Sequence, residues 1–153
     1  MRIDIEFNSG AQLPMDAIPG LARLAEAHGF GCAWAGEANN KDPTVMLAAI
    51  AAVTNRLQIG SAVYHILGRT PATLALQAVG LDELSGGRFL LGIGVSNPSI
   101  ARWHGLPFDH PLGRVASISR STGTLSRTSA TPRREGSRAA PGRPAARRSA
   151  RDG

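Results

Sequence analysis

The stretch "SGGRFLLGIGVSN", residues 85–97, decides between the folds open to this chain. It opens on two glycines, continues through the apolar run Phe89–Leu91, reaches Gly92-Ile93-Gly94 and ends in polar residues. A short apolar run bounded by turn residues is typical of a buried β-strand. Glycines within or after a strand indicate a point where another group approaches the backbone closely. The stretch therefore predicts a strand whose end is shaped for close contact.

Three further β-type runs precede this one at a regular spacing. They begin at Arg2 (RIDIEF), Phe30 (FGCAWAG) and Leu57 (LQIGSAV), and together with the run at Arg88 they start 28, 27 and 31 residues apart. A helical pattern fills each gap, and a proline stands where a first helical turn is expected. The runs are nearly continuously apolar, as is typical of strands in a parallel sheet that is buried on both faces.

Strand–helix alternation at this period indicates βαβ units with right-handed crossovers. A period near 28 residues matches a (β/α)8 barrel, in which about 250 residues divide into eight units. The doubly wound dinucleotide-binding sheet is the alternative, but its Gly-x-Gly-x-x-Gly follows the first strand. Here Gly92-Ile93-Gly94 ends the fourth run, and Asn97 stands where the third glycine would. We therefore expect an α/β fold of the TIM-barrel type, truncated to about four βα units over residues 1–113.

Charge divides the chain into two parts. Residues 1–113 carry seven Lys and Arg against nine Asp and Glu, whereas residues 114–153 carry ten Arg against two acids. From Ser119 onward 32 of 35 residues are Arg, Ser, Ala, Pro, Gly or Thr. Such a composition does not offset the entropy of ordering, so residues 114–153 are expected to form a disordered tail. Because these six residue types have GC-rich codons, a frameshift product is favoured over an arginine-rich nucleic-acid arm or a linker.

Composition also excludes several classes of protein. One cysteine, Cys32, excludes a disulfide framework and a cysteine-rich zinc site, and no metal site is expected. Asp4 and Glu6 stand where a signal peptide needs apolar residues, and no apolar run approaches the roughly 20 residues of a membrane span. A cytoplasmic chain with no membrane partner is expected.

Ligands of parallel α/β folds gather at the carboxyl ends of the strands. Polar or small residues follow all four predicted strands, among them Glu6, Glu37 and His65. His65 is a candidate for proton transfer and Glu37 for an acid at a strand end; the alternatives are a solvated loop histidine and a surface carboxylate. Asp82 and Arg88 flank a turn, where we expect them to pair as a structural contact.

Three segments carry a longer pattern: ARLAEAHGFGCAWAGE (22–37), RLQIGSAV (56–63) and, most specifically, RTPATLALQAVGLDELSGGRFLLGIGVSNP (69–98). Together they resemble the luciferase-like monooxygenase superfamily, and within it the deazaflavin-dependent branch that includes methylene-tetrahydromethanopterin reductases. The resemblance covers residues 1–113. It implies a TIM barrel that holds coenzyme F420 (a deazaflavin) or, alternatively, FMN, and that transfers hydride to a small organic substrate.

The resemblance also implies roles for single residues. In the family a non-proline cis peptide bond after the third strand lies against the cofactor ring, and it maps onto Ala62-Val63. Glu6 matches a carboxylate near the active site of the reductases. Two positions depart from the family, since Glu37-Ala38 replaces an acid–histidine pair and Asn97 replaces an aspartate. The candidate catalytic residues are Glu6, Glu37 and His65, and the candidate cofactor-binding residues are Ser61, Ala62, Val63, Gly94, Ser96 and Asn97.

Truncation bears on the expected function. The phosphate-binding loops of TIM barrels commonly follow the seventh and eighth strands, beyond the four units predicted here. The expected function is a flavin- or deazaflavin-dependent oxidoreductase that is impaired by truncation. An inactive gene product and a nucleic-acid-binding protein using the basic tail are the alternatives. A homodimer of two such halves is the one assembly left open.

Overall fold

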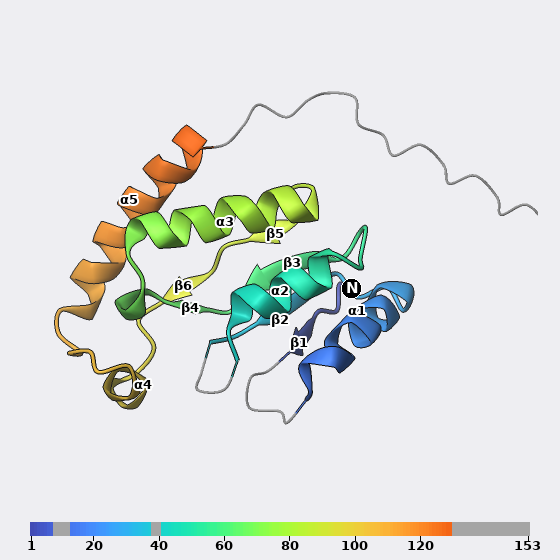
Figure 1. The fold of residues 1–153 in the computed structure, drawn as a ribbon, viewed down its shortest axis with the longest axis horizontal. Helices are drawn as coiled ribbons and strands as arrows, with labels where there is room; N and C mark the ends of the chain where they lie inside the picture. The colour runs from blue at the N-terminus through green and yellow to red at the C-terminus, as the bar shows by residue number, and fades with distance from the viewer. Residues whose placement is uncertain (8–12, 38–40, 130–153) are drawn as a thin grey trace, which may run out of the picture.

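A parallel four-stranded sheet forms the centre of the molecule (Figure 1). A computed structural model of the chain describes residues 1–7, 13–37 and 41–129, with side chains as far as Ser121. The strand order β1-β2-β3-β5 confirms the predicted parallel sheet and leaves β1 and β5 as its edges. The strands of this sheet are β1 (Ile5–Phe7), β2 (Cys32–Ala35), β3 (Gln58–Ser61) and β5 (Phe89–Leu90).

The strand predicted from Arg88 is broken into two. Its second piece, β6 (Ile93–Gly94), leaves the main sheet and pairs in parallel with β4 (Tyr64–His65). The break lies at Gly92, whose carbonyl accepts hydrogen bonds from the Tyr64 N–H at 2.9 Å and the Ser61 hydroxyl at 2.8 Å. The chain after β3 bulges here, so the fourth strand must change partners to stay hydrogen-bonded.

Three helices cover one face of the sheet (Figure 1). Two of their ends are capped by their own residues, since the Asp42 carboxylate accepts from two amides of the first turn of α2 and Gly86 ends α3 with a φ of 66°. Two shorter helices and a longer one complete the described chain. The helices are α1 (Ile18–Ala27, after the 3-10 turn η1, Met15–Ala17), α2 (Pro43–Ala51), η2 (Ile66–Gly68), α3 (Pro71–Ser85), α4 (Pro98–Trp103) and α5 (Pro111–Ser129).

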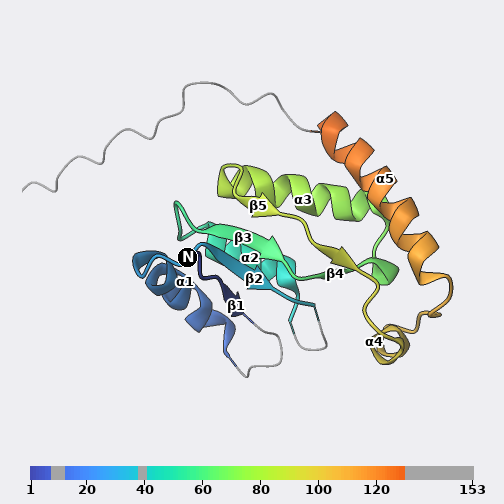
Figure 2. The same cartoon turned by 180° about the vertical axis from the view of Figure 1, so that it is seen from behind.

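The core lies between the sheet and these helices. Strand residues that face the helices are fully or almost fully buried, and the helices cover them with aliphatic side chains. The opposite face of the sheet is turned toward the viewer in Figure 2, and no helix of the described part of the chain lies over it. The buried residues of this core include Phe7, Ile18, Ala33, Ala35, Leu47, Ile50, Ile59 and Leu74.

The expected disorder of the tail is wrong for residues 114–129, which form most of α5. This helix crosses the end of α3 (Figure 1). Val115 and Ile118, three residues apart, pack against a small cluster formed by η2 and α4. Two apolar side chains on one face allow this helix to pack, although the average composition of residues 114–153 is too polar to predict it. Residues 130–153 lie outside the described residues.

The predicted pairing of Asp82 with Arg88 is also wrong, although Arg88 is structural. Its guanidinium donates to the backbone carbonyls of Ala51, Thr54 and Leu57, and its Nε donates to the carbonyl of Ser85. Burial lowers the pKa of this guanidinium. Arg88 therefore joins the end of α2 to the beginnings of β3 and β5.

Among the described residues no helix is both long and apolar enough to cross a membrane.

Candidate functional site

The carboxyl ends of β1, β2 and β3 meet at one rim of the sheet, and the bulge Ala62-Val63 lies in the middle of it. The peptide bond between Ala62 and Val63 is cis, as the family resemblance implies. The bulge is bonded twice to the end of β2, since the Ala62 N–H donates to the Ala35 carbonyl and the Val63 carbonyl accepts from the Glu37 N–H. Val63 itself remains 39% exposed. It is therefore an apolar side chain presented at the rim by fixed backbone.

Glycines let the backbone approach this bulge closely. A Cβ atom at Gly94 would lie 2.6 Å from Val63 Cγ2, and one at Gly36 would lie 2.9 Å from the Ala62 carbonyl oxygen. Both distances are too short for a real side chain, so larger residues at either position would displace the bulge. The opening feature of the sequence, Gly92-Ile93-Gly94, is thus explained by contact with the bulge.

Glu6 lies at the same rim. Its side chain is exposed, and its Oε1 atom lies 3.8 Å from the position that a Gly36 Cβ would take. The register pairs Glu6 with Trp34 on the uncovered face of the sheet. Glu6 is therefore an accessible carboxylate beside the bulge, in the position expected of a candidate acid.

Glu37 is held in a buried ion pair. Its carboxylate accepts from the Arg69 guanidinium and, at 2.7 Å, from the His65 N–H. The Glu37 and Arg69 side chains are only 11% and 9% exposed. Arg69 also lies over the Tyr64 ring, 4.7 Å from its centroid, and contacts Asp42 at 3.4 Å. Glu37 therefore orders the chain after the bulge and is not a free acid at the rim.

Replacing Glu37 by glutamine is expected to lower the free energy of unfolding by about 2 kcal/mol at pH 7, because it leaves the buried Arg69 guanidinium without its closest counter-charge. Urea unfolding followed by circular dichroism measures this change. Asp16→Asn is the matched control, since Asp16 is exposed. A loss below 0.5 kcal/mol, on the order of ordinary surface substitutions, would show that the carboxylate is not committed to this pair.

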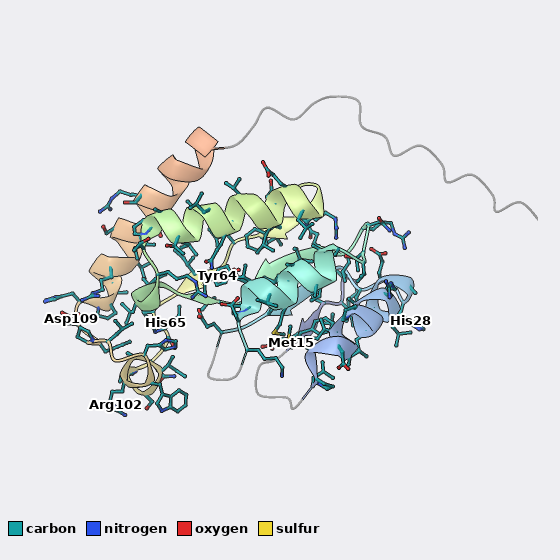
Figure 3. All side chains as sticks on the ribbon, viewed as in Figure 1. Met15, His28, Tyr64, His65, Arg102 and Asp109 are labelled. Atoms are coloured by element: carbon teal, nitrogen blue, oxygen red, sulfur yellow. The ribbon has the colours of Figure 1, made fainter. Side chains whose placement is uncertain are left out.

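His65 is buried rather than solvated. It is 1% exposed, its ring stacks on that of His104 with centroids 5.1 Å apart, and neither ring nitrogen has a hydrogen-bond partner. Figure 3 shows Tyr64 and His65 on β4; Tyr64 bonds Thr44 of α2, whereas His65 contacts the end of α4. Burial, then the charge of His104, lowers the pKa of His65. The ring is therefore neutral, and it is covered by His104, the residue that follows α4.

The lowered pKa of His65 makes stability depend on pH. The unfolded chain binds this proton near the ordinary pKa of about 6.5, and the folded chain does so only at lower pH, so stability falls as the pH drops below that value. Between pH 7.5 and 5.5 His65→Phe is expected to reduce this fall by up to about 1 kcal/mol. Urea midpoints at both pH values measure it. His28→Gln, at an exposed histidine, should leave the difference unchanged.

Two of the predicted cofactor-binding residues, Ser61 and Asn97, bond backbone groups with their side chains. Ser61 is buried, and its hydroxyl bonds both the N–H and the carbonyl of Gly92 at 2.8 Å. The Asn97 carboxamide oxygen accepts from two amides at the start of α4. Ser96 is half-buried with a φ of 63°. The geometry brings Glu6, Ala62, Val63 and Gly94 together at the rim, and it does not bring Glu37, His65 or Ser61 onto the open face.

Comparison with known proteins identifies the family. A family model described as luciferase-like monooxygenase matches residues 3–140. The chain belongs to this family. The match extends beyond residue 113, where the resemblance in the sequence was expected to end, and it includes α5.

A putative coenzyme F420-dependent oxidoreductase of Mycobacterium tuberculosis is 40% identical over 107 residues, which cover 69% of this chain and 30% of the relative. The coenzyme F420-dependent tetrahydromethanopterin reductase of Methanopyrus kandleri superposes with a TM-score of 0.69 at 24% identity, over 77% of this chain and 38% of that one. The FMN complex of the oxygenating constituent of 3,6-diketocamphane monooxygenase from Pseudomonas putida gives 0.68 at 20% identity, over 82% and 38%.

The structural matches show that the chain has an α/β fold that corresponds to part of a TIM-barrel-like architecture. The chain spans about a third of the length of the curated relative it matches. Among the described residues no group of three or more His, Cys, Asp and Glu side chains could hold a metal ion.

Sequence reasoning missed two residues of this region. Arg69 stands in the most specific motif, but nothing in the spacing shows that it pairs with Glu37, 32 residues earlier. The sequence pattern places Trp34 in an apolar strand and indicates nothing further about it. Trp34 lies in register with Gly60 of β3. A glycine beside a large ring on a neighbouring strand indicates that the ring lies across the backbone, and this pairing is the signal that could have identified Trp34.

Proposed function

We propose that this chain provides the ring-binding part of a cytoplasmic flavin- or deazaflavin-dependent oxidoreductase, which transfers hydride to or from a small organic substrate. The observation that carries the proposal is Val63, an exposed apolar side chain at the rim of a luciferase-like barrel, backed by fixed backbone and by Gly94. Coenzyme F420 is the favoured cofactor because a coenzyme F420-dependent protein is the relative with 40% identity. FMN is the alternative.

The residues at the rim fit a flat redox ring. Val63 offers an apolar surface, and the lack of a Cβ atom at Gly36 and Gly94 allows the bulge to keep its position. Such a ring, when bound, accepts or donates the hydride. The exposed Glu6 carboxylate is the group at this rim that can hold a proton for the substrate, since the Glu37 carboxylate is occupied by Arg69.

A chimera tests the proposal. The 107 aligned residues of this chain replace the matching 30% of the mycobacterial relative, so that the rim is tested within a complete barrel. We expect this chimera to bind coenzyme F420 or FMN in a fluorescence titration. Within it, Gly94→Leu is expected to weaken binding at least about tenfold, because the new side chain would displace Val63 from the ring.

Gly80→Ala is the matched control for Gly94→Leu. Gly80 lies in α3, and an added Cβ would meet nothing within 4 Å. This variant should bind the cofactor as the unmodified chimera does. A chimera that is folded, as judged by its circular dichroism, and yet binds neither cofactor would refute the proposal.

A further inference from the structure

The uncovered face of the sheet carries one large aromatic side chain, Trp34. It is half-buried and lies at the centre of this face, in register with Glu6 of β1 and Gly60 of β3. A Cβ atom at Gly60 would lie within 3.1 Å of three carbons of the Trp34 ring. The indole therefore lies across the backbone of β3, and only glycine at position 60 leaves room for it.

Hydrogen bonds fix the other end of the indole. Its Nε1–H donates to Asp4 Oδ2 at 3.2 Å, and Asp4 in turn accepts from the Arg2 guanidinium at 3.0 Å. Arg2 reaches across the face to Gln58, at 2.6 Å. These bonds from Arg2 and Trp34 lower the pKa of Asp4, so it remains an acceptor at neutral pH. The ring thus spans β1, β2 and β3, with its polar edge turned toward the amino ends of the strands.

The next positions of β2 and β3 above this ring carry small residues. Inward-facing residues of parallel barrels stack in layers along the strands. One step toward the carboxyl ends from Trp34 and Gly60, the chain places Gly36 and Ala62, and the Ala62 carbonyl and Glu6 Oε1 both lie within 4 Å of the vacant Cβ position of Gly36. Small residues therefore follow Trp34 and Gly60 toward this rim, where the bulge that carries Val63 begins at Ala62.

We propose that Trp34 forms the floor of the cofactor site, so that the flavin or deazaflavin ring contacts the indole on one side and the Ala62-Val63 bulge on the other. This inference rests on the proposed function and adds the position and depth of the ring. The Trp34–Asp4–Arg2–Gln58 network holds the floor in place. Trp34 is then a ring-contacting residue, and Asp4 is a positioning residue that acts through it.

The indole signals of the chain test this placement. The chain has two tryptophans, and Trp103, which is 63% exposed on α4, reports non-specific stacking. Trp34→Phe and Trp103→Phe assign the two indole N–H peaks in a two-dimensional ¹⁵N–¹H spectrum. FMN is then added to about 5 mM, a concentration at which at least half of the sites are occupied if the Kd is in the low millimolar range.

We expect the Trp34 indole peak and the amides of Ala62 and Val63 to move together, and to move further than the Trp103 indole peak. In Trp34→Phe the amide shifts should saturate at an FMN concentration about fivefold higher, because a smaller aromatic partner contacts the ring. Asp4→Asn should shift the Trp34 indole peak in the free protein, whereas Asp16→Asn should not.

The outcomes separate the inference from the function on which it rests. Amide shifts at Ala62 and Val63 without a shift of the Trp34 indole would overturn the inference and leave the proposed function standing. Equal shifts of both indoles would mean non-specific stacking and would also overturn it. If no peak moves, the inference fails, and the cofactor titration of the chimera decides whether the proposed function fails with it.

Discussion

Replacing Arg88 by methionine is expected to lower the free energy of unfolding by about 2–3 kcal/mol, because partly buried backbone carbonyls lose hydrogen bonds from a charged donor. Methionine keeps the apolar stem but removes every donor. The carbonyls of Ala51, Thr54 and Leu57 would then lose the guanidinium that joins the end of α2 to β3. Urea unfolding of the whole chain, followed by circular dichroism, measures the change.

Arg102→Met is the matched control for this experiment. Arg102 is exposed on α4 and bonds only the Ser99 hydroxyl at 3.2 Å within the described contacts. We expect a change within about 0.5 kcal/mol, as for most surface substitutions. A loss of less than about 1 kcal/mol in Arg88→Met would show that water replaces the guanidinium at these carbonyls.

Much of the fold could be predicted because its signals are local. Apolar runs at a nearly constant period predict the four units, and residues typical of helix ends, Asp42 and Gly86, stand where the structure begins α2 and ends α3. The break in the fourth strand could not be predicted, since it depends on the bulge 30 residues earlier. Helix α5 was missed because two apolar residues, Val115 and Ile118, stand at the start of an otherwise polar segment.

The location of the candidate site could be predicted from the sequence, but the contacts of its polar groups could not. Position at a strand end shows that Glu6, Val63 and Gly94 lie at the rim, since topology alone brings strand ends together. Position does not show which polar groups are already engaged. Glu37 is neutralised by Arg69, and His65 is covered by the residue that follows α4, His104, so both contacts cross long separations in the sequence.

The affinity for cofactor is expected to differ about a thousandfold between this chain and the chimera, or about 4 kcal/mol. The rim supplies contacts to a ring through Val63 and Gly94. Arg69 is a buried cation close to the rim, but it is paired with Glu37 and Asp42 and does not add a contact to the cofactor. The uncovered face of the sheet also leaves a bound ring open to water (Figure 2). These few contacts must offset several kcal/mol of association entropy, so we expect millimolar or weaker binding of FMN or coenzyme F420 by the chain alone.

In the chimera the remaining strands of the relative cover that face and add the later loops, which commonly bind phosphate in this architecture. Micromolar binding is therefore expected there, and equilibrium dialysis of both proteins at equal concentration measures the ratio. Micromolar binding by the chain alone would contradict this prediction. It would mean that a second copy closes the site, because the free edges of β1 and β5 are where a further sheet can pair. The affinity would then rise with protein concentration, and sedimentation would detect the dimer.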